Sequence, residues 1–149
     1  IDFCKKVLYV RKDATFGADI ITGFPTETEE MFLDSLKLVD ECKLTHLHIF
    51  PYSPRKETPA SRMPQVEKGI IKNRAKRLRD KGFKKLKENL KSKIGKKELI
   101  LVENNKNNIS LGKDQHFIKV KINERIKEGK IISCIYTGVD GDTLLAKIA

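Results

Sequence analysis

The sequence lacks tryptophan altogether and has only three cysteines among its 149 residues, Cys4, Cys42 and Cys134. The cysteines are far apart and form no Cys-x-x-Cys pair, so they predict neither a disulfide framework nor a self-contained zinc or iron–sulfur site. An odd number of scattered thiols is typical of a reducing compartment. We therefore expect a cytoplasmic protein that has no disulfide scaffold.

Long apolar runs are also missing. No run of about 18 apolar residues occurs, so no segment is expected to span a membrane. The opening stretch IDFCKKVLYV is interrupted by Asp2, and its apolar part is too short for a signal peptide. Because this stretch does not begin with methionine, we expect the sequence to start inside a larger reading frame.

Acidic residues are scarce in one segment. Residues 66–97 carry fourteen lysines and arginines against three acids, while the rest of the chain is balanced, so the whole net charge of +11 lies here. An intermittent apolar stripe predicts a long helix, which Gly82 weakens and Gly95 ends. Uncompensated positive charge favours a phosphate polymer or an anionic membrane, and the helix has too few bulky apolar residues for a membrane.

The first part of the chain alternates helix and strand patterns. Helices are predicted over residues 2–11 and 26–43, and short apolar strands over residues 18–22 and 45–50. The period of the second helix places Phe32, Leu36 and Val39 on its inward face. A strand, a helix and a strand within about 30 residues are typical of a βαβ unit with parallel strands.

The turn Gly23-Phe24-Pro25 follows the first of these strands. It lies at the carboxyl edge of the predicted sheet, where parallel α/β folds bind ligands. A tight strand-to-helix turn would use the same residues, so both interpretations stay open on this pattern alone. After the turn, Thr26 is expected to cap the helix, and Glu29 completes a capping box.

The last part of the chain has strand patterns. The runs KELILVE, HFIKVKI, KIISCIYTG and TLLAKIA predict four or five antiparallel strands, with a hairpin turn at Asp140-Gly141, and together a small β-barrel. Strict alternation places Phe117, Lys119 and Lys121 on one strand face. An aromatic ring flanked by cations suits RNA, and an ordinary solvated face is the alternative.

These motifs, in this order, resemble a known family. The stretch GADIITGFPTETEEMF, then LTHLHIFPYSPR, a basic helix and a β-rich part opening IGKKELILVE are similar to the radical-SAM tRNA methylthiotransferases. The closest likeness is to the bacterial branch that methylthiolates N6-threonylcarbamoyladenosine at tRNA position 37. The resemblance implies an α/β fold followed by an all-β fold. Residues 1–92 would be the last strands and helices of a radical-SAM (β/α) partial barrel with the basic helix, and residues 93–149 a small antiparallel OB-like TRAM barrel.

The same resemblance implies binding sites. Part of an S-adenosylmethionine pocket would be formed by Gly23, Phe24, Pro25, Glu27, Phe50, Pro51, Tyr52 and Ser53. The implied partner is tRNA. The charge of the helix and the strand pattern, without the family, indicate the candidate RNA-binding residues, which are Arg74, Arg77, Lys81, Lys84, Lys85, Phe117, Lys119 and Lys121. One loop departs from the family, because this sequence reads SPRKETPA where SPRPGTPA is common, with Lys56 and Glu57 in place of Pro-Gly.

The largest difference from the family is that the cluster-binding cysteines are missing. The family holds a [4Fe–4S] cluster on a CxxxCxxC motif and carries three further cysteines for a second cluster, and neither set occurs here. We therefore assign no catalytic and no metal-binding residue, and we expect the chain to be inactive alone. Two alternatives remain open. The chain is a C-terminal half that works with a separate N-terminal half carrying the cluster cysteines, or it is a non-catalytic TRAM-type RNA-binding protein or decayed gene remnant.

Overall fold

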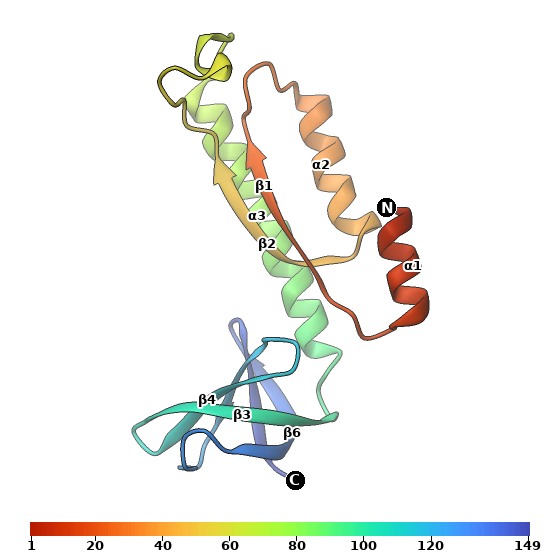
Figure 1. The fold of residues 1–149 in the computed structure, drawn as a ribbon, viewed down its shortest axis with the longest axis vertical. Helices are drawn as coiled ribbons and strands as arrows, with labels where there is room; N and C mark the ends of the chain where they lie inside the picture. Colours follow the sequence, from red (N-terminus) through yellow and green to blue (C-terminus); the bar gives the residue numbers. More distant parts are fainter. The chain divides into compact units, whose positions relative to one another are not determined.

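The computed structural model describes residues 1–149, which divide into two compact units, residues 1–85 and 86–149 (Figure 1). The first unit contains α1 (Asp2–Val10), β1 (Phe16–Thr22), α2 (Glu29–Glu41), β2 (Leu44–Pro51), the 3-10 helix η1 (Pro59–Arg62) and most of α3 (Lys68–Lys91). The second contains the end of α3 and then β3 (Lys97–Lys106), β4 (Ile109–Asp114), β5 (Lys119–Ile122), β6 (Ile131–Asp140) and β7 (Thr143–Ile148).

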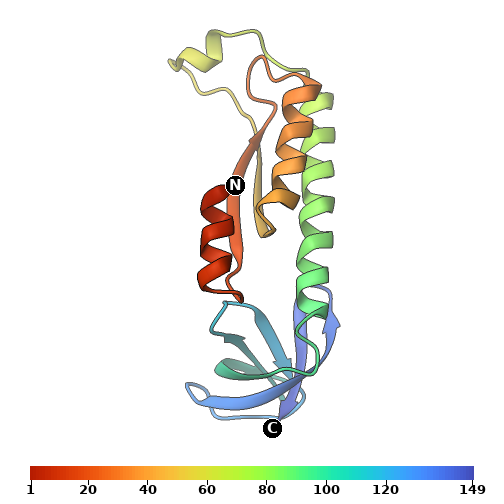
Figure 2. The same cartoon turned by 90° about the vertical axis from the view of Figure 1, so that its right-hand side faces the viewer.

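In the first unit, β1 and β2 pair in parallel, as the predicted βαβ unit requires. Both α2 and α3 cover the same face of this two-stranded sheet (Figure 2). The helix period places Phe32 and Val39 of α2 in the core, together with Ala75 and Leu78 of α3, and all four side chains are fully buried. The predicted inward face of α2 is thereby confirmed.

The opposite face of the sheet is open. Strand alternation turns Asp19, Ile21, His48 and Phe50 toward this face, and all four are exposed. Each strand also has only one neighbour, so its outer edge presents main-chain groups that no further strand pairs. Two strands do not close a barrel, and this unit therefore contains an uncovered sheet face.

The start of α2 differs from the prediction. The cap is Thr28, whose hydroxyl accepts a hydrogen bond from the Met31 N–H at 3.2 Å, and the helix begins at Glu29. The predicted capping box of Thr26 and Glu29 is wrong because Thr26 lies in the turn, with a φ of +71°.

Helix α3 is confirmed, and it ends at Lys91, four residues before Gly95. Gly82 has a packing reason to be there, since a Cβ at this position would come within 2.9 Å of Leu47 Cδ1 on β2. The last turns of α3 carry Leu86 and Leu90, which pack into the core of the second unit.

The second unit is a closed five-stranded barrel with the strand order β3-β4-β5-β7-β6. The expectation of an all-antiparallel barrel is wrong in one place, because β5 and β7 pair in parallel, with Val120 opposite Leu144. The predicted hairpin between β6 and β7 is confirmed, with Asp140 paired to Thr143 and Gly141 at a φ of +62°.

One predicted strand is shorter than its alternating pattern. Strand β5 begins at Lys119, and Phe117 precedes it in a turn with a φ of +60°. Phe117 therefore does not share a strand face with Lys119 and Lys121. The reason is local: the Asp114 side chain bonds to the main chain of the turn, which interrupts the extended backbone.

Candidate cofactor cleft and basic helix

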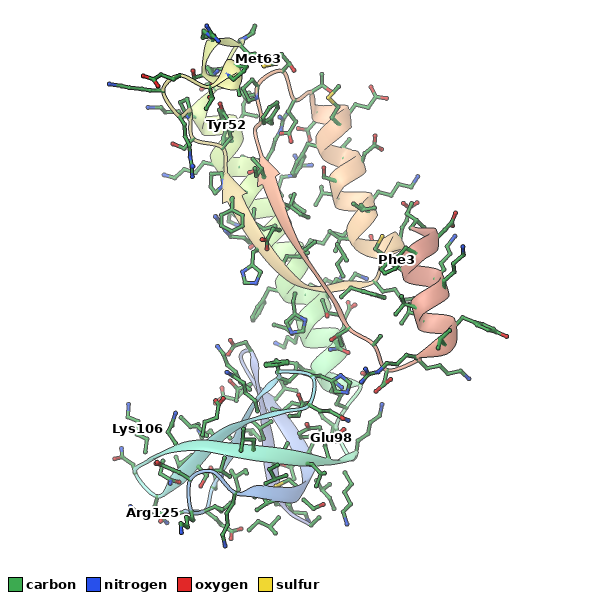
Figure 3. The ribbon with its side chains drawn as sticks, in the orientation of Figure 1. Phe3, Tyr52, Met63, Glu98, Lys106 and Arg125 are labelled. Carbon is green, nitrogen blue, oxygen red and sulfur yellow. The ribbon has the colours of Figure 1, made fainter.

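A cleft of about 600 Å³ opens where β2 ends, on the uncovered side of the sheet. Four residues predicted to bind the cofactor line it, namely Phe50, Pro51, Tyr52 and Ser53, and β1 contributes Asp19 and Ile21. Tyr52 lies just past the carboxyl end of β2 (Figure 3). This volume falls in the range of small-molecule sites, and the lining combines aromatic walls with few polar groups, as such sites do.

The Gly-Phe-Pro turn, residues 23–25, lies beside this cleft rather than in its wall. The Phe24 ring meets the Tyr52 ring edge-on, with centroids 5.5 Å apart. Gly23 has a φ of +72° and packs so closely on Ile71 of α3 that a Cβ would overlap that side chain. Pro25 is fully buried. The turn is therefore fastened to α3, and it reaches the cleft through Phe24.

An ion pair holds the turn in place. The Glu27 carboxylate accepts hydrogen bonds from the Gly23 N–H at 2.9 Å and from Arg74 Nη1 at 2.7 Å. Arg74 Nη1 also donates to the Glu27 carbonyl at 2.9 Å. The Arg74 side chain, a predicted RNA-binding residue, is only 5% exposed and is engaged within the unit.

Glu29 extends this network at the start of α2. It accepts from Arg74 Nε at 3.3 Å and from Arg77 Nη1 at 2.6 Å. The Arg77 guanidinium, which also stacks over the Phe32 ring, holds the pKa of Glu29 below its usual value.

A second acid pairs with α3 near the end of α2. Asp40 accepts from Lys81 Nζ at 2.5 Å and from Lys85 Nζ at 2.8 Å. The two ammonium groups lower the pKa of Asp40, Lys81 being the stronger influence. Lys81 and Lys85 are thus partly engaged within the unit, whereas Lys84 is exposed.

The charged face of α3 that remains open is made of residues that the sequence did not single out as a set. Lys72, Lys84 and Lys87 are exposed, and Lys76 is exposed as well but pairs with Asp80. Lys72 also lines a second cleft of about 610 Å³, on the other side of the Pro51–Ser53 segment. Contacts with α2 and with the turn before it decide which other cations of α3 are buried or paired. The sequence of α3 alone therefore does not predict which of its cations face outward.

The predicted RNA-binding residues of the barrel also have acidic neighbours. Lys119 Nζ lies 2.8 Å from an Asp142 oxygen, and Lys121 Nζ lies 3.9 Å from an Asp140 oxygen. Phe117 is 81% exposed.

Known proteins resemble this chain. No family model matches it. It is 46% identical over 140 residues, 94% of this chain, to the threonylcarbamoyladenosine tRNA methylthiotransferase MtaB of Rickettsia prowazekii. It is 37% identical over 68% of its length to a tRNA-2-methylthio-N(6)-dimethylallyladenosine synthase of Bifidobacterium adolescentis. A probable threonylcarbamoyladenosine tRNA methylthiotransferase of Archaeoglobus fulgidus is 43% identical over 60% of the chain.

The chain belongs to the tRNA methylthiotransferases. It matches the C-terminal part of such an enzyme. The matched residues span 32% of the Rickettsia protein and 21% of the Bifidobacterium protein.

Radical-SAM methylthiotransferases use S-adenosylmethionine and iron–sulfur clusters. Tyr52 lines the cleft at the end of β2, and its hydroxyl is buried without a hydrogen-bond partner, which is compatible with part of an S-adenosylmethionine site. The thiols of this methylthiotransferase segment do not fit a cluster. No three His, Cys, Asp or Glu side chains are placed to hold a metal ion, and burial raises the pKa of the Cys134 thiol. In addition, no helix is long and apolar enough to cross a membrane.

Proposed function

We propose that this chain is the C-terminal portion of an enzyme that methylthiolates N6-threonylcarbamoyladenosine at tRNA position 37. Residues 1–92 are the last part of its radical-SAM barrel, with the basic helix, and residues 93–149 are its TRAM domain. The 46% identity to the Rickettsia methylthiotransferase over 94% of the chain supports this assignment. The five-stranded closure with one parallel pair, β5 with β7, supports an OB-like barrel for the TRAM domain.

In this proposal, the sheet of the first unit is one wall of the S-adenosylmethionine site. The observation that carries it is the cleft at the end of β2, where Phe50, Pro51, Tyr52 and Ser53 converge. Phe50 and Tyr52 would offer apolar surface to the cofactor, and Tyr52 also carries a polar group. The open sheet face and its unpaired edges are covered by the N-terminal portion of the enzyme, which also carries the cluster cysteines. The clusters, held by cysteines outside this chain, would supply the reducing chemistry.

A measurement of cofactor binding tests whether the first unit forms part of the S-adenosylmethionine site. We expect the 149-residue chain to bind labelled S-adenosylmethionine in a saturable but weak manner, because part of the pocket wall is absent. Phe50→Ala should abolish the binding measured by equilibrium dialysis, while Phe3→Ala, which removes an exposed ring from α1 (Figure 3), should leave it unchanged. If cofactor binding is absent while RNA binding is intact, the alternative of a non-catalytic RNA-binding protein is favoured.

The second part of the proposal is tRNA binding through the exposed cations of α3 and the barrel. Phosphate contacts release counterions, so affinity for tRNA should fall steeply as salt rises. The double variant Lys84→Gln/Lys87→Gln removes two exposed cations. It should make the negative slope of log K against log salt shallower by about two, at roughly one for each phosphate contact that is lost.

A matched variant distinguishes a direct phosphate contact of the α3 cations from an effect of the net charge of the chain. Lys6→Gln/Lys12→Gln removes the same charge from exposed positions in and after α1. We expect its salt slope to equal that of the wild-type chain. If both double variants change the slope equally, the α3 cations act only through overall charge, and the proposed contact is wrong.

A further inference from the structure

The loop between β4 and β5 displays a single aromatic ring. Phe117 is 81% exposed and has a φ of +60°. A left-handed backbone is uncommon and unfavourable for a bulky side chain. Such conformations persist when surrounding groups enforce them, and they gather at ligand sites.

The enforcing group is Asp114. One of its carboxylate oxygens accepts from the N–H groups of His116 at 2.8 Å and Ile118 at 2.9 Å, on both sides of Phe117. The other oxygen accepts from the buried Tyr136 hydroxyl at 2.8 Å, and burial, together with the bond to this carboxylate, raises the pKa of Tyr136. Asp114 is itself buried. The loop is therefore tied to the barrel core, and the backbone that carries the exposed ring is held in one place.

We infer that Phe117 is a preformed stacking platform for one unpaired RNA base, with Asp114 as its positioning residue. This inference rests on the proposed tRNA-binding function and specifies how the barrel contributes to it. A ring face offers each base a stacking surface whatever its sequence. Because the clamp orders the loop before binding, stacking requires little additional loss of conformational freedom.

The surroundings favour a base over a protein partner. The residues that flank the ring most closely in sequence and are exposed, Gln115 and Lys119, are polar or charged, so the loop itself presents one aromatic ring and no further apolar side chain. A stable protein interface needs a far larger contiguous area. Lys119, the nearest cation in sequence, already pairs with Asp142. The platform should therefore contribute through stacking, and its contribution should depend little on salt, unlike that of the α3 cations.

The test uses the full 149-residue chain and two probes: an RNA hairpin with 2-aminopurine in its loop, and a fully paired RNA duplex of the same length. Phe117→Leu keeps apolar volume but removes the ring. It should weaken hairpin binding by about tenfold, abolish the 2-aminopurine quenching and leave the salt slope unchanged. Phe117→Tyr should retain both affinity and quenching. The matched control is Phe3→Leu, another exposed ring, which should have no effect.

The positioning role of Asp114 is tested by Asp114→Asn, which keeps the shape but removes the charge from the clamp. We expect weaker hairpin binding and reduced quenching, with duplex binding and the melting temperature of the barrel changed much less. An equal loss for hairpin and duplex would mean that Asp114 only supports the fold. If the wild-type chain binds the hairpin and the Phe117→Leu variant binds it equally well, the proposal that Phe117 stacks on a base is wrong. If the wild-type chain binds neither RNA, the proposed function fails as well.

Discussion

Replacing Arg74 by methionine should destabilise the first unit by about 3–5 kcal/mol, the cost of removing one partner from a buried ion pair. Arg74 is 5% exposed and bonds to both the carboxylate and the carbonyl of Glu27. Methionine fills much of the space but leaves the Glu27 carboxylate, 11% exposed, without its cation. Such a loss is a large fraction of the about 5–15 kcal/mol that stabilises a typical protein.

Urea denaturation followed by circular dichroism measures this effect, since the chain has no tryptophan for fluorescence. The control is Lys76→Met on the same helix, whose side chain is 74% exposed and pairs with Asp80 at the surface. We expect a change within about 1 kcal/mol for this variant. Adding Glu27→Gln to Arg74→Met should recover part of the loss, because no charge is then left buried. A similar small loss for Arg74→Met and Lys76→Met would show that the Glu27 pair is not structural.

The second large effect is expected at Gly23. Alanine there meets two penalties, a φ of +72° and an overlap of its Cβ with Ile71. Together these should reduce the free energy of unfolding of the first unit by about 2–4 kcal/mol. The turn that carries Phe24 toward Tyr52 would have to move away from α3, so weakened S-adenosylmethionine binding should accompany the loss of stability.

Gly129→Ala isolates the first of these penalties. Gly129 has a φ of +78°, and a Cβ there would meet nothing within 4 Å. Its substitution should cost the second unit about 1–2 kcal/mol, the price of the backbone conformation alone. Equal losses at Gly23 and Gly129 would mean that the contact with Ile71 relaxes freely and that α3 does not fix the turn.

Local patterns predicted much of the fold. The apolar spacing of Phe32 and Val39 correctly indicated the inner face of α2, and Asp140-Gly141 correctly indicated the hairpin between β6 and β7. Each depends on residues a few positions apart, so a periodic pattern carries the information. The parallel pairing of β5 with β7 involves strands separated by β6, and strand patterns do not specify such partners.

The candidate site was predicted less completely, for a physical reason. The resemblance indicated Phe50 to Ser53, and these residues do line one cleft. The high cation content of helix α3 led to the prediction that Arg74 lies on the RNA-binding surface. Its actual partner, Glu27, lies 47 positions earlier in the chain, and only the packing of α3 on the turn brings them together. Likewise, alternation placed Phe117 in a strand, because a pattern of apolar residues does not register the bonds that Asp114 makes to the main chain.

The uncovered outer edges of β1 and β2 have a practical consequence for every measurement on this chain. Each molecule offers two lines of main-chain donors and acceptors to which a strand of another molecule can add. Association between copies therefore rises with protein concentration. Titrations are best arranged with a trace of labelled RNA or cofactor and dilute protein.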